Sequence, residues 1–209
     1  MENTRYLQRY SDSDRINHWA LVIFFFCAAL SGLSMFHPSM FFFSALFGGG
    51  AWSRILHPFA GVLAFLFFCG MYARVARDNV WNADDSGWVS RFRSIVAGRF
   101  DEVPPVGRFN AGQKIVFWWM AVCLALLLLT GFVFWRPYFA GYFSIDLVRL
   151  ATLVHSLTAV ALILGIIVHI YAAIWVKGTT RAMTRGTVPE SWARHHHPRW
   201  AEQVTQDKR

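Results

Sequence analysis

Four long apolar segments constrain this chain more than any other feature of its sequence. A helix needs roughly 20 apolar residues to cross a hydrocarbon core of about 30 Å. Runs of that length predict transmembrane helices over about 17–36, 53–76, 112–135 and 148–177. Only 15% of the residues are charged, against about 25% in soluble domains. The sequence therefore predicts an all-α membrane protein, with a four-transmembrane-helix bundle over 1–178 and a polar tail over 179–209.

The lysines and arginines predict which side of the membrane each loop occupies. All but three of the 20 lie in the terminal segments or in a long middle loop at about 73–114, the exceptions being Arg54, Arg136 and Arg149. Basic residues gather on the cytoplasmic side of membrane proteins. Both termini, and the tail over 179–209, are therefore expected in the cytoplasm. The net charge of +8 reflects this topology rather than a nucleic-acid-binding stripe.

Apart from the lysines and arginines near the span ends, the ionisable residues that stand out in the predicted spans are histidines. Intramembrane ionisable groups are costly and are usually functional. His155 and His169 are 14 residues apart in the fourth span, so a helix places them on one face, about 21 Å apart along its axis. Each has a partner at its own depth: His57 pairs with His155 outside, and His18 pairs with His169 inside. Two bis-histidine sites stacked in a helix bundle are what two b-type haems require.

Other interpretations of these histidines make different demands on the sequence. A lone buried histidine often hydrogen-bonds a neighbouring carbonyl, but four at two matched depths favour metal ligation. A transition-metal transporter would add carboxylates or thiolates to the imidazoles, and the spans lack that pattern. A passive membrane anchor for a soluble enzyme is a further alternative.

Several residues near the histidines have two interpretations. The haem propionates are expected to pair with arginines at the ends of the spans, unless these arginines only snorkel to the interface. Glycines could admit a flat porphyrin or could simply allow close helix packing. The histidines at 195–197 and the tryptophans of the tail are expected at a surface that faces headgroups or a partner. The arginines are Arg15, Arg54 and Arg149; the glycines are Gly32 and Gly61; the tryptophans include Trp192 and Trp200.

Motifs along nearly the whole chain carry a family resemblance. They are Arg-Ile-Asn-His-Trp at 15–19, Arg-Ile-Leu-His-Pro-Phe at 54–59, Arg-Phe-Asn-Ala-Gly-Gln-Lys at 108–114, Trp-Arg-Pro-Tyr-Phe at 135–139, His-Ile-Tyr-Ala-Ala-Ile-Trp-Val-Lys-Gly at 169–178 and His-His-Pro-Arg-Trp at 196–200. The chain resembles the gamma subunits, the membrane cytochromes b, of bacterial respiratory formate dehydrogenases. Related subunits serve hydrogenases and thiosulfate reductases, which remain the alternative.

The resemblance implies a role in electron transport in the respiratory chain of the bacterial inner membrane. It implies an iron–sulfur beta subunit and a molybdenum- or tungsten-pterin alpha subunit, where formate is oxidised. Electrons would pass through two haems b to menaquinone or ubiquinone near the cytoplasmic face, which contributes to the proton motive force. It assigns His57 and His155 to the outer haem iron, and His18 and His169 to the inner one.

The resemblance also places a quinone site at Asn110, Gly112, Gln113 and His169. The side-chain amides can hydrogen-bond quinone oxygens, and Gly112 leaves room for a ring. From the residues alone, helix capping by Asn110 is the stronger interpretation.

Overall fold

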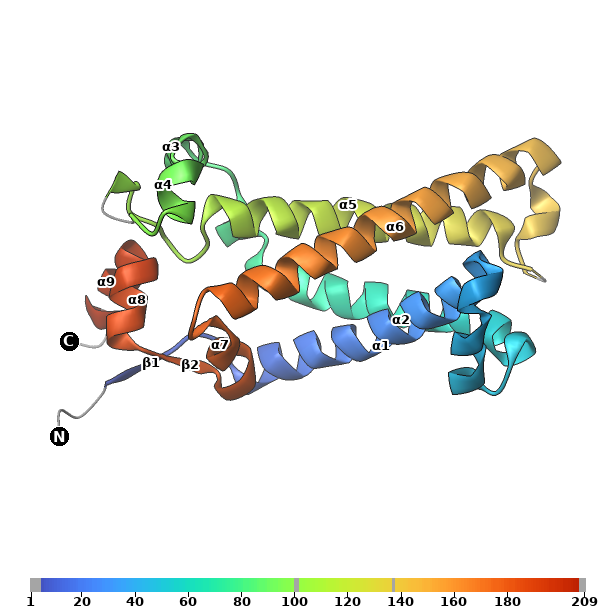
Figure 1. Cartoon of the computed structure of the whole chain (residues 1–209), viewed down its shortest axis with the longest axis horizontal. Coiled ribbons are helices and arrows are strands. Elements are labelled where there is room, and N and C mark those ends of the chain that lie inside the picture. Colours follow the sequence, from blue (N-terminus) through green and yellow to red (C-terminus); the bar gives the residue numbers. More distant parts are fainter. Residues whose placement is uncertain (1–4, 100–101, 137, 207–209) are drawn as a thin grey trace. The chain divides into compact units, whose positions relative to one another are not determined.

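Four long apolar helices form the framework of the chain. The computed structural model describes residues 5–99, 102–136 and 138–206. The long helices are α1 (Asp12–Phe36), α2 (Gly50–Val75), α5 (Ala111–Phe134) and α6 (Ile145–Trp175), each long and apolar enough to cross a membrane (Figure 1). The predicted fold class is confirmed in this respect. Pro137, expected to follow the third span, lies outside the described residues.

All four helices begin before the predicted spans, and polar residues cap the earlier starts of α1 and α6. Ser11 and Asp14 form reciprocal bonds at the start of α1: Asp14 N donates to Ser11 Oγ at 3.2 Å, and Ser11 N donates to Asp14 Oδ2 at 3.0 Å. The Ser144 hydroxyl accepts from Leu147 N at 3.3 Å at the start of α6. Such caps satisfy backbone N–H groups that have no partner within the helix. Hydropathy alone therefore sets these helix starts too late.

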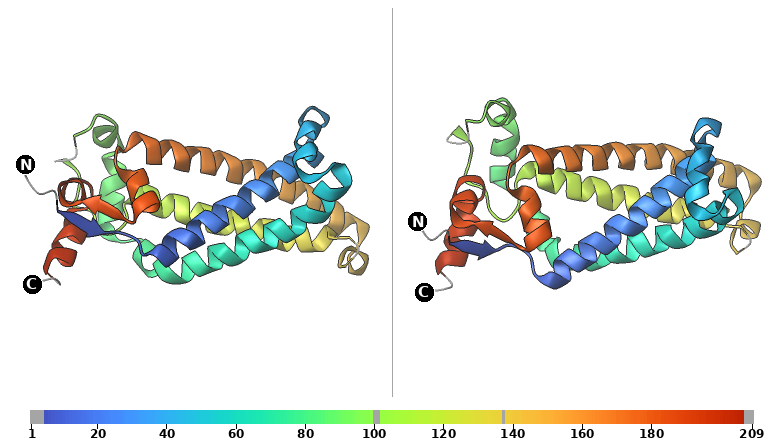
Figure 2. Two further views of the ribbon diagram at one scale, coloured as in Figure 1. Left: turned by 90° about the horizontal axis from the view of Figure 1, so that it is seen from below. Right: turned by 60° about the horizontal axis from the view of Figure 1, so that its bottom comes forward.

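The chain divides into two compact units, and one of them holds most of the apolar helix length. It comprises Ile16–Tyr72 and Trp119–Val168. Within it, α1 and α2 form one helical hairpin, and α5 and α6 form another (Figure 2). The apolar run after α1, too short to span, is a 3₁₀ helix, η1 (Pro38–Phe47), and the second hairpin turns through η4 (Ala140–Tyr142). We call this part the helical unit.

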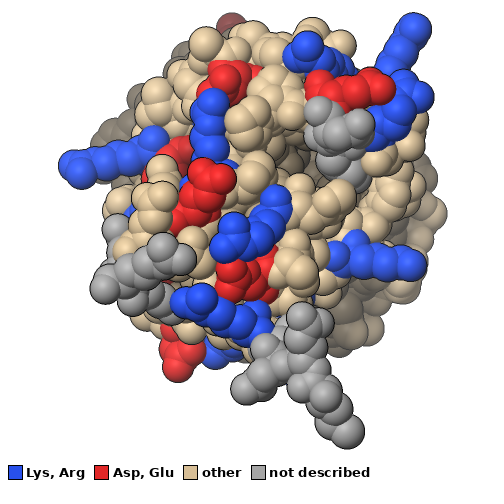
Figure 3. All heavy atoms as spheres, turned by 90° about the vertical axis from the view of Figure 1, so that its left-hand side faces the viewer, with Lys and Arg blue, Asp and Glu red and all other residues tan. Residues whose placement is uncertain are grey.

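The other unit gathers three segments that are far apart in the sequence: the N-terminal residues through Arg15, Ala73–Trp118, and the chain from His169 onward. A small antiparallel sheet joins β1 (Tyr6–Gln8) to β2 (Thr187–Pro189), with Leu7 opposite Val188. Around it lie the short helices α7 (Thr179–Arg185), α8 (Glu190–His196) and α9 (Pro198–Gln206). We call this part the polar unit. Its visible face carries acidic and basic side chains intermixed (Figure 3).

The segment 179–206 is thus folded, and this corrects two expectations about exposed residues. Trp200 is only 6% exposed and belongs to a core with Leu7 and Val188. The Arg9 guanidinium lies 4.3 Å from the centroid of the Trp200 ring. His197 is 2% exposed, and its Nδ1 donates to Gly107 O at 2.9 Å. Neither residue faces headgroups or a partner, because packing against the N-terminal strand and the middle loop covers them.

The middle loop is likewise ordered by the chain itself. It contains η2 (Arg77–Asn79), α3 (Ala83–Ser90) and α4 (Phe92–Val96). Arg199 N donates to Val106 O at 3.2 Å, and Arg199 Nη1 also donates to Asp84. A second ion pair joins Arg108 to Asp78 at 2.8 Å. These bonds connect the loop to α9 and connect its own two ends.

Candidate haem-binding site

His57 of α2 and His155 of α6 lie together inside the helical unit. The centroids of their imidazole rings are 6.1 Å apart, with 68° between the ring planes. Both side chains are partly buried. The edge of the His155 ring also meets Phe134, with centroids 5.0 Å apart. The pair that depth alone predicted is therefore brought together by the fold.

The neighbouring helix α1 holds the His57 ring through one nitrogen. Nδ1 of His57 lies 3.0 Å from Ala28 O and 3.1 Å from Ser31 Oγ. A carbonyl oxygen only accepts hydrogen bonds, so Nδ1 carries the proton. Nε2 of the neutral ring then carries the lone pair. His57 is thereby held in the tautomer that a metal-ligating histidine requires.

The second hairpin holds His155 in the same way. Nδ1 of His155 lies 2.9 Å from Thr130 Oγ1. The Thr130 hydroxyl donates to Leu126 O at 2.6 Å. Its oxygen is then left to accept from His155 Nδ1–H. Sequence reasoning missed both Ser31 and Thr130; the available signal was a hydroxyl residue followed by glycine in each of two apolar helices.

The spacing of His57 and His155 would allow both to hold one haem iron. Imidazole–metal bonds are about 2 Å long, so two imidazoles that share one metal ion have centroids roughly 6 Å apart. The observed 6.1 Å matches this. Residues 5–99, 102–136 and 138–206 hold no group of three or more His, Cys, Asp or Glu suited to a metal ion. The two imidazoles of His57 and His155 would be the donors to a haem iron here, a set that suits a b-type haem.

A glycine lies next to each ring, and the approach is tight only at Gly32. A Cβ on Gly32 would lie 3.0 Å from His57 Cε1, and one on Gly131 would lie 3.5 Å from His155 Cε1. Nothing lies within 4 Å of the position that a Cβ on Gly61 would take. Gly32 thus makes room for a histidine ring, and the admission of a porphyrin by Gly32 or Gly61 stays a prediction.

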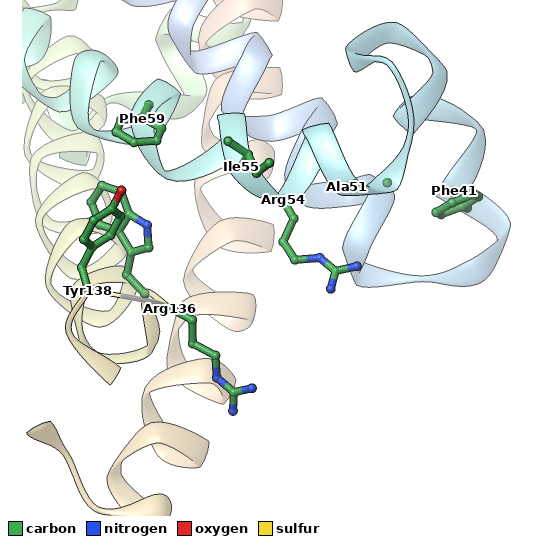
Figure 4. A pocket seen from close by; sticks show the side chains of 9 residues that line it. Phe41, Ala51, Arg54, Ile55, Phe59, Arg136 and Tyr138 are labelled. Carbon is green, nitrogen blue, oxygen red and sulfur yellow. The ribbon is translucent and has the colours of Figure 1, made fainter. Parts of the chain in front are cut away.

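The arginines expected near the propionates lie in different surroundings. Arg54 and Arg136 border an open pocket of about 630 Å³, where both guanidinium groups extend away from the rings of Phe59 and Tyr138 (Figure 4). Arg149 lies 3.8 Å from Asp146 on its own helix and is highly exposed. Arg15, in the polar unit, pairs with Asp12 of α1 at 2.9 Å. Of the three predicted arginines, only Arg54 lines this pocket.

The two histidines of the predicted inner site belong to different units. His18 lies near the start of α1 in the helical unit, and its ring meets Trp19 edge-on, with centroids 5.5 Å apart. His169 lies in α6, at the point where the chain enters the polar unit. Their pairing across one haem stays a prediction.

Asn110 and Gln113 cap the first turn of α5. Asn110 N donates to Gln113 Oε1 at 3.0 Å, and Gln113 N donates to Asn110 Oδ1 at 2.9 Å. This reciprocal arrangement is a capping box, so the capping function weighed from sequence is present. A Cβ on Gly112 would lie 3.1 Å from the Trp88 ring. The carbonyl oxygens face the backbone, and the amide –NH₂ groups are the donors that remain for a ligand.

Comparison with known protein families defines the class of protein to which this chain belongs. A family model described as prokaryotic cytochrome b561 matches residues 9–186. The chain therefore belongs to the prokaryotic cytochrome b561 family of membrane cytochromes, and haem b is the cofactor that this family implies.

Among individual relatives, the similarity extends over nearly the full length. The chain is 48% identical over 196 residues to the formate dehydrogenase cytochrome b556(fdo) subunit of Escherichia coli K12, covering 94% of this chain and 92% of the relative. It is 39% identical over 204 residues to the nitrate-inducible cytochrome b556(Fdn) subunit of the same strain, covering 98% and 94%. The cytochrome b556 subunit of Haemophilus influenzae is 38% identical over 200 residues, covering 96% and 84%.

Proposed function

We propose that this chain is the membrane cytochrome b subunit of a formate dehydrogenase and that it carries electrons across the bacterial inner membrane to quinone. The observation that carries the proposal is the His57–His155 pair, with Nδ1 of each ring held by a neighbouring helix. The similarity to three formate dehydrogenase subunits supports the choice of enzyme. The electron donor would be an iron–sulfur beta subunit, which is served by a molybdenum- or tungsten-pterin alpha subunit.

Two pairs of histidines would hold the cofactors. His57 and His155 would ligate an outer haem, and His18 and His169 an inner one. Haem b supplies one-electron redox chemistry when it is bound. The protein's part is to keep Nε2 of each ligand unprotonated, to fix the ring orientation and to exclude water from the apolar helices. Hydrophobic surroundings and hydrogen bonds on the ligands tune the reduction potential.

The quinone would bind near the start of α5, beside His169. The amide –NH₂ groups of Asn110 and Gln113 would donate to the quinone oxygens. Gly112 lies against the Trp88 ring, and an aromatic face of this kind suits a planar ligand. With both termini in the cytoplasm, quinone reduction at this end would take protons from that side. Each charge that crosses the membrane is worth about 2.3 kcal/mol per 100 mV.

Purification of the complex from membranes through a tag on this chain tests the enzyme assignment. The proposal expects pterin-bearing and iron–sulfur subunits in the preparation, formate-dependent quinone reduction, and loss of that reduction in the His169→Ala variant. Partners that contain nickel would instead indicate a hydrogenase. Unchanged quinone reduction in the His169→Ala variant would support a passive anchor.

A further inference from the structure

Each helical hairpin presents its histidine through the same set of contacts. In the first, Ser31 and Gly32 of α1 contact His57 of α2, 26 residues after the serine. In the second, Thr130 and Gly131 of α5 contact His155 of α6, 25 residues after the threonine. The hydroxyl meets Nδ1 in both cases, and the glycine lies against the ring, tightly at Gly32 and in ordinary van der Waals contact at Gly131. The second hairpin thus repeats the arrangement of the first.

A second polar contact sets the register of each hairpin nearer its other end. Asn17 Nδ2 donates to Phe67 O at 2.7 Å, next to Gly70, in the first hairpin. Trp119 Nε1 donates to Ala161 O at 3.2 Å, next to Gly165, in the second. Two polar contacts per hairpin fix both the sliding and the rotation of its helices. The hydroxyl groups are therefore held in place against the imidazoles.

Hydroxyl groups in apolar helices commonly bond the carbonyl one turn earlier, and both of these do so. Ser31 Oγ donates to Cys27 O at 2.6 Å and Thr130 Oγ1 donates to Leu126 O at 2.6 Å. These two hydroxyl groups differ from the common case because each also contacts an imidazole nitrogen. Ser31 Oγ lies 3.1 Å from His57 Nδ1, and Thr130 Oγ1 lies 2.9 Å from His155 Nδ1. By contrast, Thr152 on α6 is exposed, and its hydroxyl bonds Val148 O at 2.8 Å.

We propose that Ser31 and Thr130 are positioning residues that accept the Nδ1–H of His57 and His155 and thereby set the reduction potential of the outer haem. The proposal rests on the proposed ligation of that haem by these two histidines. A hydrogen bond from Nδ1–H raises the basicity of the ligating nitrogen. A more basic ligand stabilises ferric over ferrous iron. Removal of the two acceptors should therefore raise the midpoint potential of the outer haem and leave the inner haem unchanged.

The test is a redox titration of both haems in the purified complex. The variants are Ser31→Ala, Thr130→Val and their combination, with Thr130→Ser as the conservative variant and Thr152→Val as the matched control on α6. Loss of a hydrogen-bond partner of a metal ligand typically changes metal affinity or activity by 10–100-fold. The double variant should shift the ferric–ferrous equilibrium of the outer haem about tenfold, which is about 59 mV for one electron. Each single variant should shift less, because the hydroxyl that contacts the other histidine remains.

The outcomes separate this inference from the proposed function. A wild-type complex that lacks a haem dependent on His57 and His155 overturns the proposed ligation. If that haem is present and the double variant titrates like the wild type, the role of the hydroxyls is wrong. Loss of the haem in Thr130→Val with retention in Thr130→Ser supports the role, whereas loss in both variants contradicts it. An equal shift in Thr152→Val also contradicts it.

Discussion

The buried ion pair of the polar unit allows the sharpest prediction about how the middle loop is held. Lys114 Nζ lies 2.7 Å from Asp85 Oδ2, and the two side chains are 4% and 6% exposed. Asp85 also accepts from Asn82 N at 2.7 Å, and Lys114 donates to Val80 O at 2.9 Å. The pair thereby ties α3 and the residues before it to the first turn of α5, beside the proposed quinone site.

Lys114→Met keeps most of the apolar stem of the side chain and leaves the Asp85 carboxylate buried without its cation. Breaking a buried pair in this way costs about 3–5 kcal/mol. The lower value applies here because Asp85 keeps its bond from the Asn82 backbone. A loss of about 3 kcal/mol corresponds to a roughly 100-fold rise in the open population of the segment. Combining Lys114→Met with Asp85→Asn removes the unpaired charge and should recover much of the loss.

Hydrogen–deuterium exchange read by mass spectrometry on peptides from 79–90 measures this opening in the purified complex. Arg194→Met is the control, since it removes an exposed ion pair of 2.6 Å with Glu190 and should cost only about 0.3–0.5 kcal/mol in α8. The reasoning is refuted if Lys114→Met leaves exchange in 79–90 within twofold of the wild type, or if the double variant exchanges as fast as the single one.

Three further predictions concern the two units separately. Burial lowers the pKa of His197 to about 3, whereas the unfolded residue titrates near 6.5; below pH 6.5 only the unfolded state takes up the proton. The polar unit should therefore keep its full free energy of unfolding above that pH and lose about 2 kcal/mol of it by pH 5. Acid unfolding monitored by tryptophan fluorescence measures this loss, and His197→Gln should remove it. Trp200→Ala, at a 6% exposed position, should lower the free energy of unfolding by about 3–5 kcal/mol. Limited proteolysis should then cut the segment 179–206 faster than in the wild type. A variant as resistant to the protease as the wild type would count against a shared core. Gly32→Ala places a Cβ 3.0 Å from His57 Cε1 and should lower the haem content of the complex. Gly61→Ala, with open space around the new Cβ, should leave the haem content unchanged. Equal haem content in both variants would contradict the steric argument.

The long helices could be predicted from sequence because a membrane span needs a long apolar run and few other structures tolerate one. Their ends could not be predicted so well. α1 begins at Asp12 instead of about residue 17 because Ser11 and Asp14 cap it. A hydropathy window responds to apolar side chains and does not register such local hydrogen bonds.

The polar unit was the larger omission. Its core joins Leu7, Val188 and Trp200, and its loop contacts join residues as distant as Arg9 and Arg108. Hydrophobic periodicity within a segment does not predict contacts between distant segments, and helices as short as α7 and α8 give little periodic signal. The polar composition of these segments therefore suggested a tail and a loop.

The candidate site was predictable in part. Helical rise separated His155 from His169, and the place of His57 at the start of the second span put it at the depth of His155. The structure brings the rings of His57 and His155 together; their role as ligands stays a prediction. Ser31 and Thr130 were missed because a hydroxyl in an apolar helix is usually satisfied by its own helix. Only the structure shows that each also contacts an imidazole of the neighbouring helix.

Haem quantitation in the two outer-site variants tests the central claim most directly. The ratio of haem b to this chain is measured in the purified complex for the wild type, for His57→Ala, for His155→Ala and for the double variant. If both histidines ligate one haem, the wild type holds two haems, and each single variant and the double variant hold one. A double variant that loses both haems, while each single variant loses one, would show that the two histidines serve different haems and would contradict the account.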